Sequence, residues 1–240
     1  MRLVREHILF VDTETSGIPK DWHAPYATKD NWPFIVQIAW VIYTRDGQLI
    51  KTGNYYIKAN DYTISDTSKS IHGITEDYLQ AHGEERKTVM QWLHNDLLTY
   101  QPLVVSHFAQ LDFHMLGLGF YRSGLSNPVT ELPTFCTMTL TQNFILRPHQ
   151  RLLRLGELYQ RLFNMPLDNQ HDALADAEAT AKCFFKLLER GDISERIIDR
   201  QQKKERLSYE LGRKNSRLPY LLLTLALGLL LILILLFNSR

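Results

Sequence analysis

The chain has 240 residues, 22% charged and 45% hydrophobic, and roughly its first 190 suffice for one well-packed core. Its net charge of +1 hides a division: residues 1–191 carry 18 Lys and Arg against 21 Asp and Glu, whereas residues 192–217 carry 8 against 5. The net charges are therefore −3 for residues 1–191 and +3 for residues 192–217. The negative charge of residues 1–191 excludes a domain that is held on nucleic acid by bulk positive charge. Two cysteines, Cys136 and Cys183, lie in apolar contexts without metal-ligand spacing, which excludes a disulfide framework and predicts buried, reduced thiols.

The first part of the chain predicts an antiparallel meander. Residues 7–11 form a short apolar run that is typical of a buried strand. Residues 34–43 are rich in β-branched and aromatic side chains, and Asp46-Gly47 then supplies a hairpin turn into residues 48–57. Between the first two strands, residues 18–33 hold two tryptophans and three prolines and predict a long irregular loop, of the kind that is more often functional than idle.

Helices and shorter strands alternate after residue 62. Residues 103–106 and 134–137 predict two strands, each followed by a helix, and the alanine-rich residues 173–189 predict the last helix of the domain. A meander followed by alternating β and α units indicates an α/β fold with a mixed five-stranded sheet flanked by helices. The last helix has four core candidates: Leu174, Phe184, Leu187 and Leu188.

Two further segments follow the domain of residues 1–190. Residues 191–217 are dense in charge and favour a helix without heptad spacing, so they predict a solvated linker. Residues 218–237 carry no charge, and as a helix they would span roughly 30 Å, the thickness of a bilayer's hydrocarbon core. Basic residues just before this span predict, by the positive-inside rule, a single-pass tail anchor in the lipid bilayer with the domain in the cytosol. A buried core helix is the alternative.

Three segments place acidic residues where a metal site could form. Asp12 and Glu14 are two apart at a strand end, so their side chains project to the same face. Carboxylates so close raise each other's proton affinity unless a cation lies between them. Asp112 opens a helix after an apolar strand, where a simple helix cap is the alternative. His171 precedes Asp176 by five residues at the start of the last helix, which predicts that both face the same centre.

These segments resemble the three motifs of the DEDDh exonucleases, the DnaQ-like family. Residues 12–17 resemble the first motif, Asp-x-Glu-Thr-x-Gly, and residues 171–176 resemble the third, His-x-Ala-x-x-Asp. A related subclass has a tyrosine where this chain has Asp172, a plausible helix cap, so the resemblance is to the histidine subclass. The second motif departs from the family's His-Asn-Ala, because Phe108 stands in the place of the asparagine.

The resemblance covers residues 7–190 and implies a ribonuclease-H-like fold and a 3′–5′ exonuclease. It implies that Asp12, Glu14, Asp112 and Asp176 hold two Mg²⁺ or Mn²⁺ ions for hydrolysis of phosphodiester bonds, with His171 as the general base. Oxygen ligands with no nearby cysteine suit these hard cations better than zinc.

The same resemblance implies a substrate and the residues that contact it. The expected substrate-binding residues are Thr15, His72, Gly73 and His107. The expected partners are nucleic-acid 3′ ends, DNA before RNA and single-stranded or frayed, from which 5′-mononucleotides are released. RNA or oligonucleotide trimming by the same site is one alternative, and a catalytically silent nucleic-acid-binding adaptor is another. The sequence does not tell whether a polymerase is a partner. Four intact carboxylates disfavour the adaptor.

Overall fold

The computed structural model describes residues 5–144 and 151–203, and residues up to Ile198 belong to one compact unit. Within the described residues, the strands form one mixed five-stranded sheet in the order β3-β2-β1-β4-β5. The strands are β1 (His7–Thr15), β2 (Ile35–Thr44), β3 (Leu49–Tyr56), β4 (Leu103–Ser106) and β5 (Thr134–Cys136). β2 pairs antiparallel with β1 and β3, whereas β4 pairs parallel with β1 and β5, which confirms the predicted meander and mixed sheet.

The hairpin between β2 and β3 forms at the predicted turn. Gly47 has φ of 86°, a left-handed conformation that glycine adopts without steric cost. The backbone N–H of Gly47 donates to the carbonyl of Thr44 at 3.0 Å, and the N–H of Thr44 donates to Gln48 at 2.8 Å. The Asp46-Gly47 dipeptide therefore sets the register of the meander.

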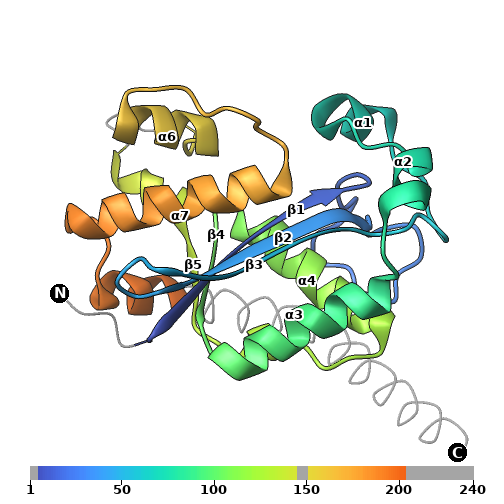
Figure 1. Cartoon of the computed structure of the whole chain (residues 1–240), viewed down its shortest axis with the longest axis horizontal. Helices are drawn as coiled ribbons and strands as arrows, with labels where there is room; N and C mark the ends of the chain where they lie inside the picture. The colour runs from blue at the N-terminus through green and yellow to red at the C-terminus, as the bar shows by residue number, and fades with distance from the viewer. Residues whose placement is uncertain (1–4, 145–150, 204–240) are drawn as a thin grey trace, which may run out of the picture. The chain divides into compact units, whose positions relative to one another are not determined.

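Helices cover both faces of the sheet (Figure 1). α3 (Arg86–Tyr100) and α4 (Ala109–Ser123) pack on one face, and α6 (Leu155–Phe163) and α7 (Ala173–Glu189) pack on the other. The short helices α1 (Asp66–His72) and α2 (Glu76–His82) lie beyond the carboxyl end of β1. The remaining turns are η1 (Pro128–Glu131), α5 (Thr137–Leu140) and η2 (Thr141–Phe144).

Strand β1 is buried on both sides because successive side chains enter different cores. Leu9 and Val11 pack in the cluster with α3 and α4, whereas Ile8 and Phe10 pack in the cluster with α7. The ring of Phe10 meets that of Phe184 edge-on at 5.3 Å. β1 is therefore held between two helical layers, and its carboxyl end opens between the starts of α4 and α7.

The last helix has the predicted bounds and most of the predicted core. Phe184 and Leu187 are fully buried, and Leu174 and Leu188 are partly buried against the same cluster. The predicted burial of both cysteines is confirmed as well. Burial raises the pKa of the Cys183 thiol to about 12, which keeps it protonated and unreactive.

The segment after α7 differs in part from the predicted solvated linker. Ile193 and Ile198 are buried in the cluster of α7. Ile193 lies in the turn after α7, and Ile198 lies in a helical segment that begins at Glu195. Residues 204–217 and the predicted membrane span at residues 218–237 lie outside the described part of the chain. Among the described residues, no helix has both the length and the apolar character that crossing a membrane requires.

Candidate active site

The first two carboxylates stand at the carboxyl end of β1, which continues past the predicted apolar run to Thr15. Asp12 and Glu14 pair with Ala39 and Gln37 of β2, and the register shifts immediately after Glu14. The alternation that sends Phe10 towards α7 also sends Asp12 and Glu14 to that face. Both carboxylates are thereby directed to the N-terminus of α7.

The N-terminus of α7 supplies the third motif. Asp172 is the helix cap that the sequence predicts, because its side chain accepts a hydrogen bond from the N–H of Ala175 at 3.0 Å. His171, just before it, has φ of 68°, a left-handed conformation that is uncommon for a residue with a Cβ. In that conformation its backbone N–H donates to Oδ2 of Asp176 at 3.1 Å. The turn therefore ties His171 directly to the carboxylate that follows it by five residues.

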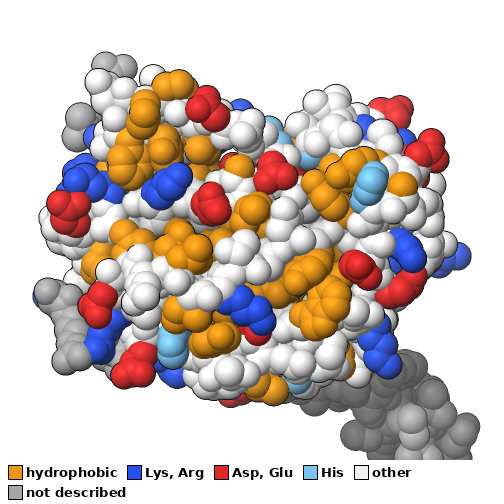
Figure 2. All heavy atoms as spheres, in the orientation of Figure 1, with side chains coloured by type: hydrophobic (Ala, Val, Ile, Leu, Met, Phe, Trp, Pro, Cys, Tyr) orange, Lys and Arg blue, Asp and Glu red, His pale blue; other side chains and the backbone are white. Residues whose placement is uncertain are grey.

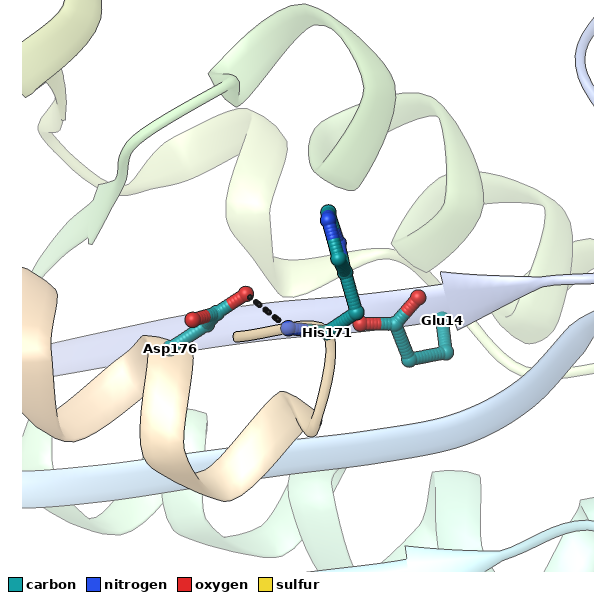
Figure 3. A group of neighbouring side chains, drawn as sticks. All are labelled: Glu14, His171 and Asp176. Atoms are coloured by element: carbon teal, nitrogen blue, oxygen red, sulfur yellow. Dashed lines mark hydrogen bonds between the residues drawn. The ribbon is translucent and has the colours of Figure 1, made fainter. Parts of the chain in front are cut away.

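The side chains of Glu14, His171 and Asp176 meet at one point. One ligand atom from each lies within 4.8 Å of those of the other two. Figure 3 shows the Glu14 and Asp176 carboxylates on opposite sides of His171, whose imidazole projects away from the sheet. The imidazole is exposed, whereas both carboxylates are buried. The predicted convergence of the first and third motifs is therefore present in the fold.

Asp112 reaches the same area from α4, and it is not a helix cap. Phe108 occupies the cap position, and Asp112 lies one turn further on with 2% of its surface exposed. The Thr13 hydroxyl donates to its Oδ1 at 2.7 Å, and the Ser106 hydroxyl donates to its Oδ2. The sequence did not single out these two hydroxyls. Strand alternation was the available signal for Thr13, because it turns towards α4 when Asp12 and Glu14 turn towards α7.

The electrostatics of the site show a surplus of buried negative charge. Burial, and then Asp112, Asp176 and Glu14, raise the pKa of Asp12 well above its ordinary value. Burial, and then Asp176 and Asp112, raise the pKa of Glu14 from 4.5 to about 8.

The other two carboxyls are also shifted upward. Burial raises the pKa of Asp112 to about 6, although the hydrogen bonds from Ser106 and Thr13 oppose the rise. Burial raises the pKa of Asp176 against the hydrogen bond from the His171 backbone. Within residues 5–144 and 151–203, no lysine or arginine forms an ion pair with any of the four carboxylates.

These residues fit a divalent cation. Oδ1 of Asp176 is buried and has no hydrogen-bond partner among the described residues, so one acceptor in the cluster is left for a ligand. Carboxylate oxygens are the donors that hard divalent cations prefer. A cation would also relieve the mutual repulsion that raises the carboxyl pKa values.

The four residues expected to bind substrate lie in two different settings. His72 ends α1 and donates from Nε2 to the carbonyl of Thr15 at 3.2 Å, while its Nδ1 accepts from the N–H of Ile74 at 3.0 Å. Gly73 is the left-handed C-cap of α1, with φ of 73°. The Thr15 hydroxyl donates to the carbonyl of Gly17 at 2.7 Å. These three residues therefore build the rim beside Glu14, and burial, with a small contribution from nearby His171, lowers the pKa of His72.

His107 differs from the other three because its ring is engaged inside the protein. It is 4% exposed, its Nε2 lies 3.0 Å from the carbonyl of Leu153, and its Nδ1 lies 2.9 Å from the Thr137 hydroxyl. Burial lowers its pKa to about 4. A neutral imidazole with both nitrogens occupied joins β4, α5 and the start of α6, and has no free nitrogen for a substrate. We therefore do not retain His107 as a substrate contact.

A buried amide fixes the start of α7 against the sheet, and the sequence did not single it out. Gln37 on β2 is 1% exposed, and its Nε2 donates to Asp172 and to Asn54, both at 3.0 Å. Its Oε1 accepts from the N–H of Ala173 at 3.3 Å. Gln37 thereby holds the turn that carries His171.

Comparison with protein families decides the family of this chain. The family model described as Exonuclease, RNase_T, matches residues 9–184. The chain belongs to this exonuclease family. Its domain is therefore a nuclease, an enzyme, as the motifs predicted.

Curated relatives of the chain include PolC-type DNA polymerase III proteins. The protein of Oceanobacillus iheyensis is 28% identical over 194 residues, covering 78% of this chain and 12% of the relative. That of Bacillus subtilis is 28% identical over 220 residues, covering 90% of this chain and 13% of the relative. The chain thus spans only about an eighth of the length of these relatives.

Solved structures share the fold at low identity. Exonuclease I of E. coli in complex with a dT13 oligonucleotide matches with a TM-score of 0.62 and 22% identity, covering 77% of this chain and 41% of that one. The nuclease domain of 3′hExo, a DEDDh family member bound to rAMP, matches with a TM-score of 0.61 and 17% identity, covering 80% and 96%. The predicted ribonuclease-H-like exonuclease fold is confirmed.

Proposed function

We propose that this chain is a metal-dependent 3′–5′ exonuclease that releases 5′-mononucleotides from DNA. The observation that carries the proposal is the convergence of Glu14, His171 and Asp176, with Asp112 close enough to raise the pKa of both Glu14 and Asp12. Buried carboxylates without basic partners are costly to the fold, and a bound divalent cation offsets that cost.

The four carboxylates would hold the cations, two Mg²⁺ or Mn²⁺ by the family resemblance. Bound there, the cations would supply Lewis-acid stabilisation of the phosphodiester and an acidic water. Thr13 and Ser106 would keep the Asp112 carboxylate in one orientation, because each oxygen accepts one of their hydroxyls.

His171 would take the proton from the attacking water. Its imidazole is exposed to solvent, and a ring nitrogen lies within 4.8 Å of a carboxylate oxygen of both Glu14 and Asp176. Its main chain is fixed by the bond to Asp176, so the ring can turn without moving the helix. Such a base contributes typically 10²- to 10⁴-fold to the rate of hydrolysis.

DNA is the proposed substrate, and RNA is the second candidate. Two similar structures support both candidate substrates, since one holds a dT13 oligonucleotide and the other holds rAMP. On the face drawn in Figure 2, basic, acidic and apolar side chains of the described residues are interspersed, which fits local contacts better than binding by bulk charge.

The test compares the full chain in non-ionic detergent with its Asp12→Ala variant. Substrates are 5′-labelled single-stranded DNA, blunt duplex DNA and RNA, each with Mg²⁺, with Mn²⁺ and with chelator. We expect stepwise shortening from the 3′ end that requires the divalent ion and is absent in the variant. Persistent hydrolysis by a folded Asp12→Ala protein, or internal cleavage as the first product, would contradict the proposal.

We also propose that residues 218–237 anchor the enzyme in a membrane with the domain in the cytosol. The support is the uncharged stretch and the net positive charge of residues 192–217 before it. In cells, the full chain should remain in the membrane fraction after alkaline washing, and a chain lacking residues 218–237 should be released. Release of the full chain by the wash would exclude the anchor.

A further inference from the structure

An aromatic surface lies next to Asp112, and the proposed reaction does not account for it. It combines the predicted irregular loop, residues 18–33, with the position where the second motif departs from the family pattern. Phe108 is the cap residue of α4, yet it makes no side-chain capping hydrogen bond and is 41% exposed. Polar residues are strongly preferred at this position because they satisfy the free N–H groups of the first turn. A phenyl ring there supplies no cap to the helix, and much of it stays open to solvent.

Phe108 is part of a row of rings. Trp22 of the loop lies 6.2 Å from Phe108 and 6.0 Å from His114, measured between ring centroids. Tyr26 lies 6.0 Å from His114 and 6.2 Å from Tyr121, which is 54% exposed. From Phe108 to Tyr121 the row follows α4 for about 20 Å, at about 1.5 Å of rise per residue.

The loop is fixed in place by bonds that serve no catalytic purpose. The Asn31 side chain closes it by exchanging hydrogen bonds with the main chain of Asp21, at 2.8 and 2.9 Å. Arg122 of α4 donates to the carbonyls of Trp32 and Pro33, at 3.0 and 2.6 Å. The rings are thus held before any ligand arrives, which lowers the entropy lost on binding.

The loop also packs closely on α4. A Cβ at Gly117 would lie 2.5 Å from the Tyr26 hydroxyl oxygen, so the glycine makes room for the loop. The Tyr26 hydroxyl lies 3.2 Å from Nδ1 of His114, and the Trp32 indole donates to the carbonyl of Pro25 at 3.1 Å. These contacts hold the loop that carries Trp22 against α4.

The position of the row points to its ligand. Phe108 precedes Asp112 by four residues, so the two lie on one face of α4 in successive turns, and the N–H of Asp112 bonds to the Phe108 carbonyl at 3.3 Å. A strand whose 3′ end lies at the carboxylates would pass these rings with its next nucleotides. Aromatic rings stack on unpaired bases of any sequence, whereas the bases of a duplex already stack on each other.

We propose that Phe108 and Trp22 form a stacking site for an unpaired base upstream of the cleaved nucleotide, which gives the enzyme its preference for single-stranded 3′ ends. The inference rests on the proposed exonuclease function and adds the residues that select an unpaired strand. Stacking does not depend on the sugar, so the site accepts unpaired DNA and RNA alike.

The test measures binding of 5′-labelled oligonucleotides by fluorescence anisotropy, with the full chain carrying His171→Gln so that cleavage is slow. DNA and RNA oligonucleotides carry one abasic nucleotide at each of the first six positions from the 3′ end in turn. We expect about 5- to 150-fold weaker binding when one position is abasic, and a similar loss for Phe108→Ala with the intact oligonucleotide. In Phe108→Ala the abasic position should cost nothing more, because its stacking partner is gone.

Phe108→Asn and Trp92→Ala separate stacking from folding. Asn is a good capping residue, so Phe108→Asn should unfold at the same temperature as the parent or higher while binding as weakly as Phe108→Ala. Trp92→Ala removes a ring that is 37% exposed on α3, and it should bind like the parent. Parent-like binding by Phe108→Asn, or equal losses in Trp92→Ala, would overturn the inference.

A second substrate separates failure of the stacking site from failure of the proposed function. The p-nitrophenyl ester of thymidine 5′-monophosphate has no upstream base, and its hydrolysis by the chain with His171 intact reports the carboxylate site alone. Ester hydrolysis together with oligonucleotide binding that ignores every abasic position overturns the stacking site and retains the nuclease. No ester hydrolysis and no oligonucleotide binding overturns both.

Discussion

Replacing Glu14 by glutamine should stabilise the metal-free protein at pH 8. The unfolded chain loses the Glu14 proton near pH 4.5, whereas the folded protein keeps it until about pH 8. Because the folded pKa is the higher one, unfolding releases a proton between these values. The contribution of Glu14 to the free energy of unfolding is complete below about pH 4.5 and is lost as the pH rises towards 8.

The magnitude follows from the size of the pKa change. A rise of about 3.5 in pKa corresponds to about 5 kcal/mol of lost stability above pH 8, at about 1.36 kcal/mol for each pKa unit. Glu14→Gln has no charge to bury, so it should recover up to that amount. For a domain of this size, such a change raises the unfolding temperature by about 10–20 °C.

The assay is thermal unfolding of the full chain in detergent from pH 5 to pH 9, with chelator and with Mg²⁺. With chelator, the parent should lose stability across this range, and Glu14→Gln should lose less. Mg²⁺ should stabilise the parent most at high pH and the variant only weakly, since one ligand is missing. Glu178→Gln, at a carboxylate on α7 outside the cluster, is the matched control. Equal unfolding temperatures for parent and Glu14→Gln at pH 8 in chelator would refute the reasoning.

Three further substitutions test the support of the site. Thr13→Val removes a donor to Asp112, and because that bond lowers its pKa, the acid limb of the pH–rate profile should move up by about 1–2 pH units; an unchanged limb would contradict this. Gln37→Leu leaves Asp172 without its amide donor, and should cost about 1–3 kcal/mol in denaturant unfolding and lower kcat. A Gln37→Leu enzyme with parental kcat would show that the anchor is dispensable. His171→Gln should lower kcat by about 10²- to 10⁴-fold while retaining stabilisation by Mg²⁺ at pH 8, and loss of that stabilisation would make it a metal ligand instead of a base.

Local patterns were sufficient for the strands and for two of the three motifs. Alternation and β-branched runs predicted β2 to β5 to within one residue, whereas β1 runs past the predicted residues 7–11 to Thr15. The alanine-rich run predicted α7 with its cap at Asp172. Asp12 and Glu14 could be placed on one face because strand geometry fixes which side chains lie together. The resemblance of these motifs to those of a known family indicated an exonuclease, and the family model that matches residues 9–184 confirms it.

The sequence by itself determined the candidate site residues, since motif spacing and strand alternation are local properties. Only the tertiary structure decided whether Asp112 caps a helix or joins the cluster. Its carboxylate is held by the hydroxyls of Thr13 on β1 and Ser106 on β4, and the contact with Thr13 joins segments far apart in the chain. It also decided that His107 is buried and that Phe108 stands beside Trp22. Burial and contact depend on the packing of segments far apart in the chain, and no local pattern contains that information.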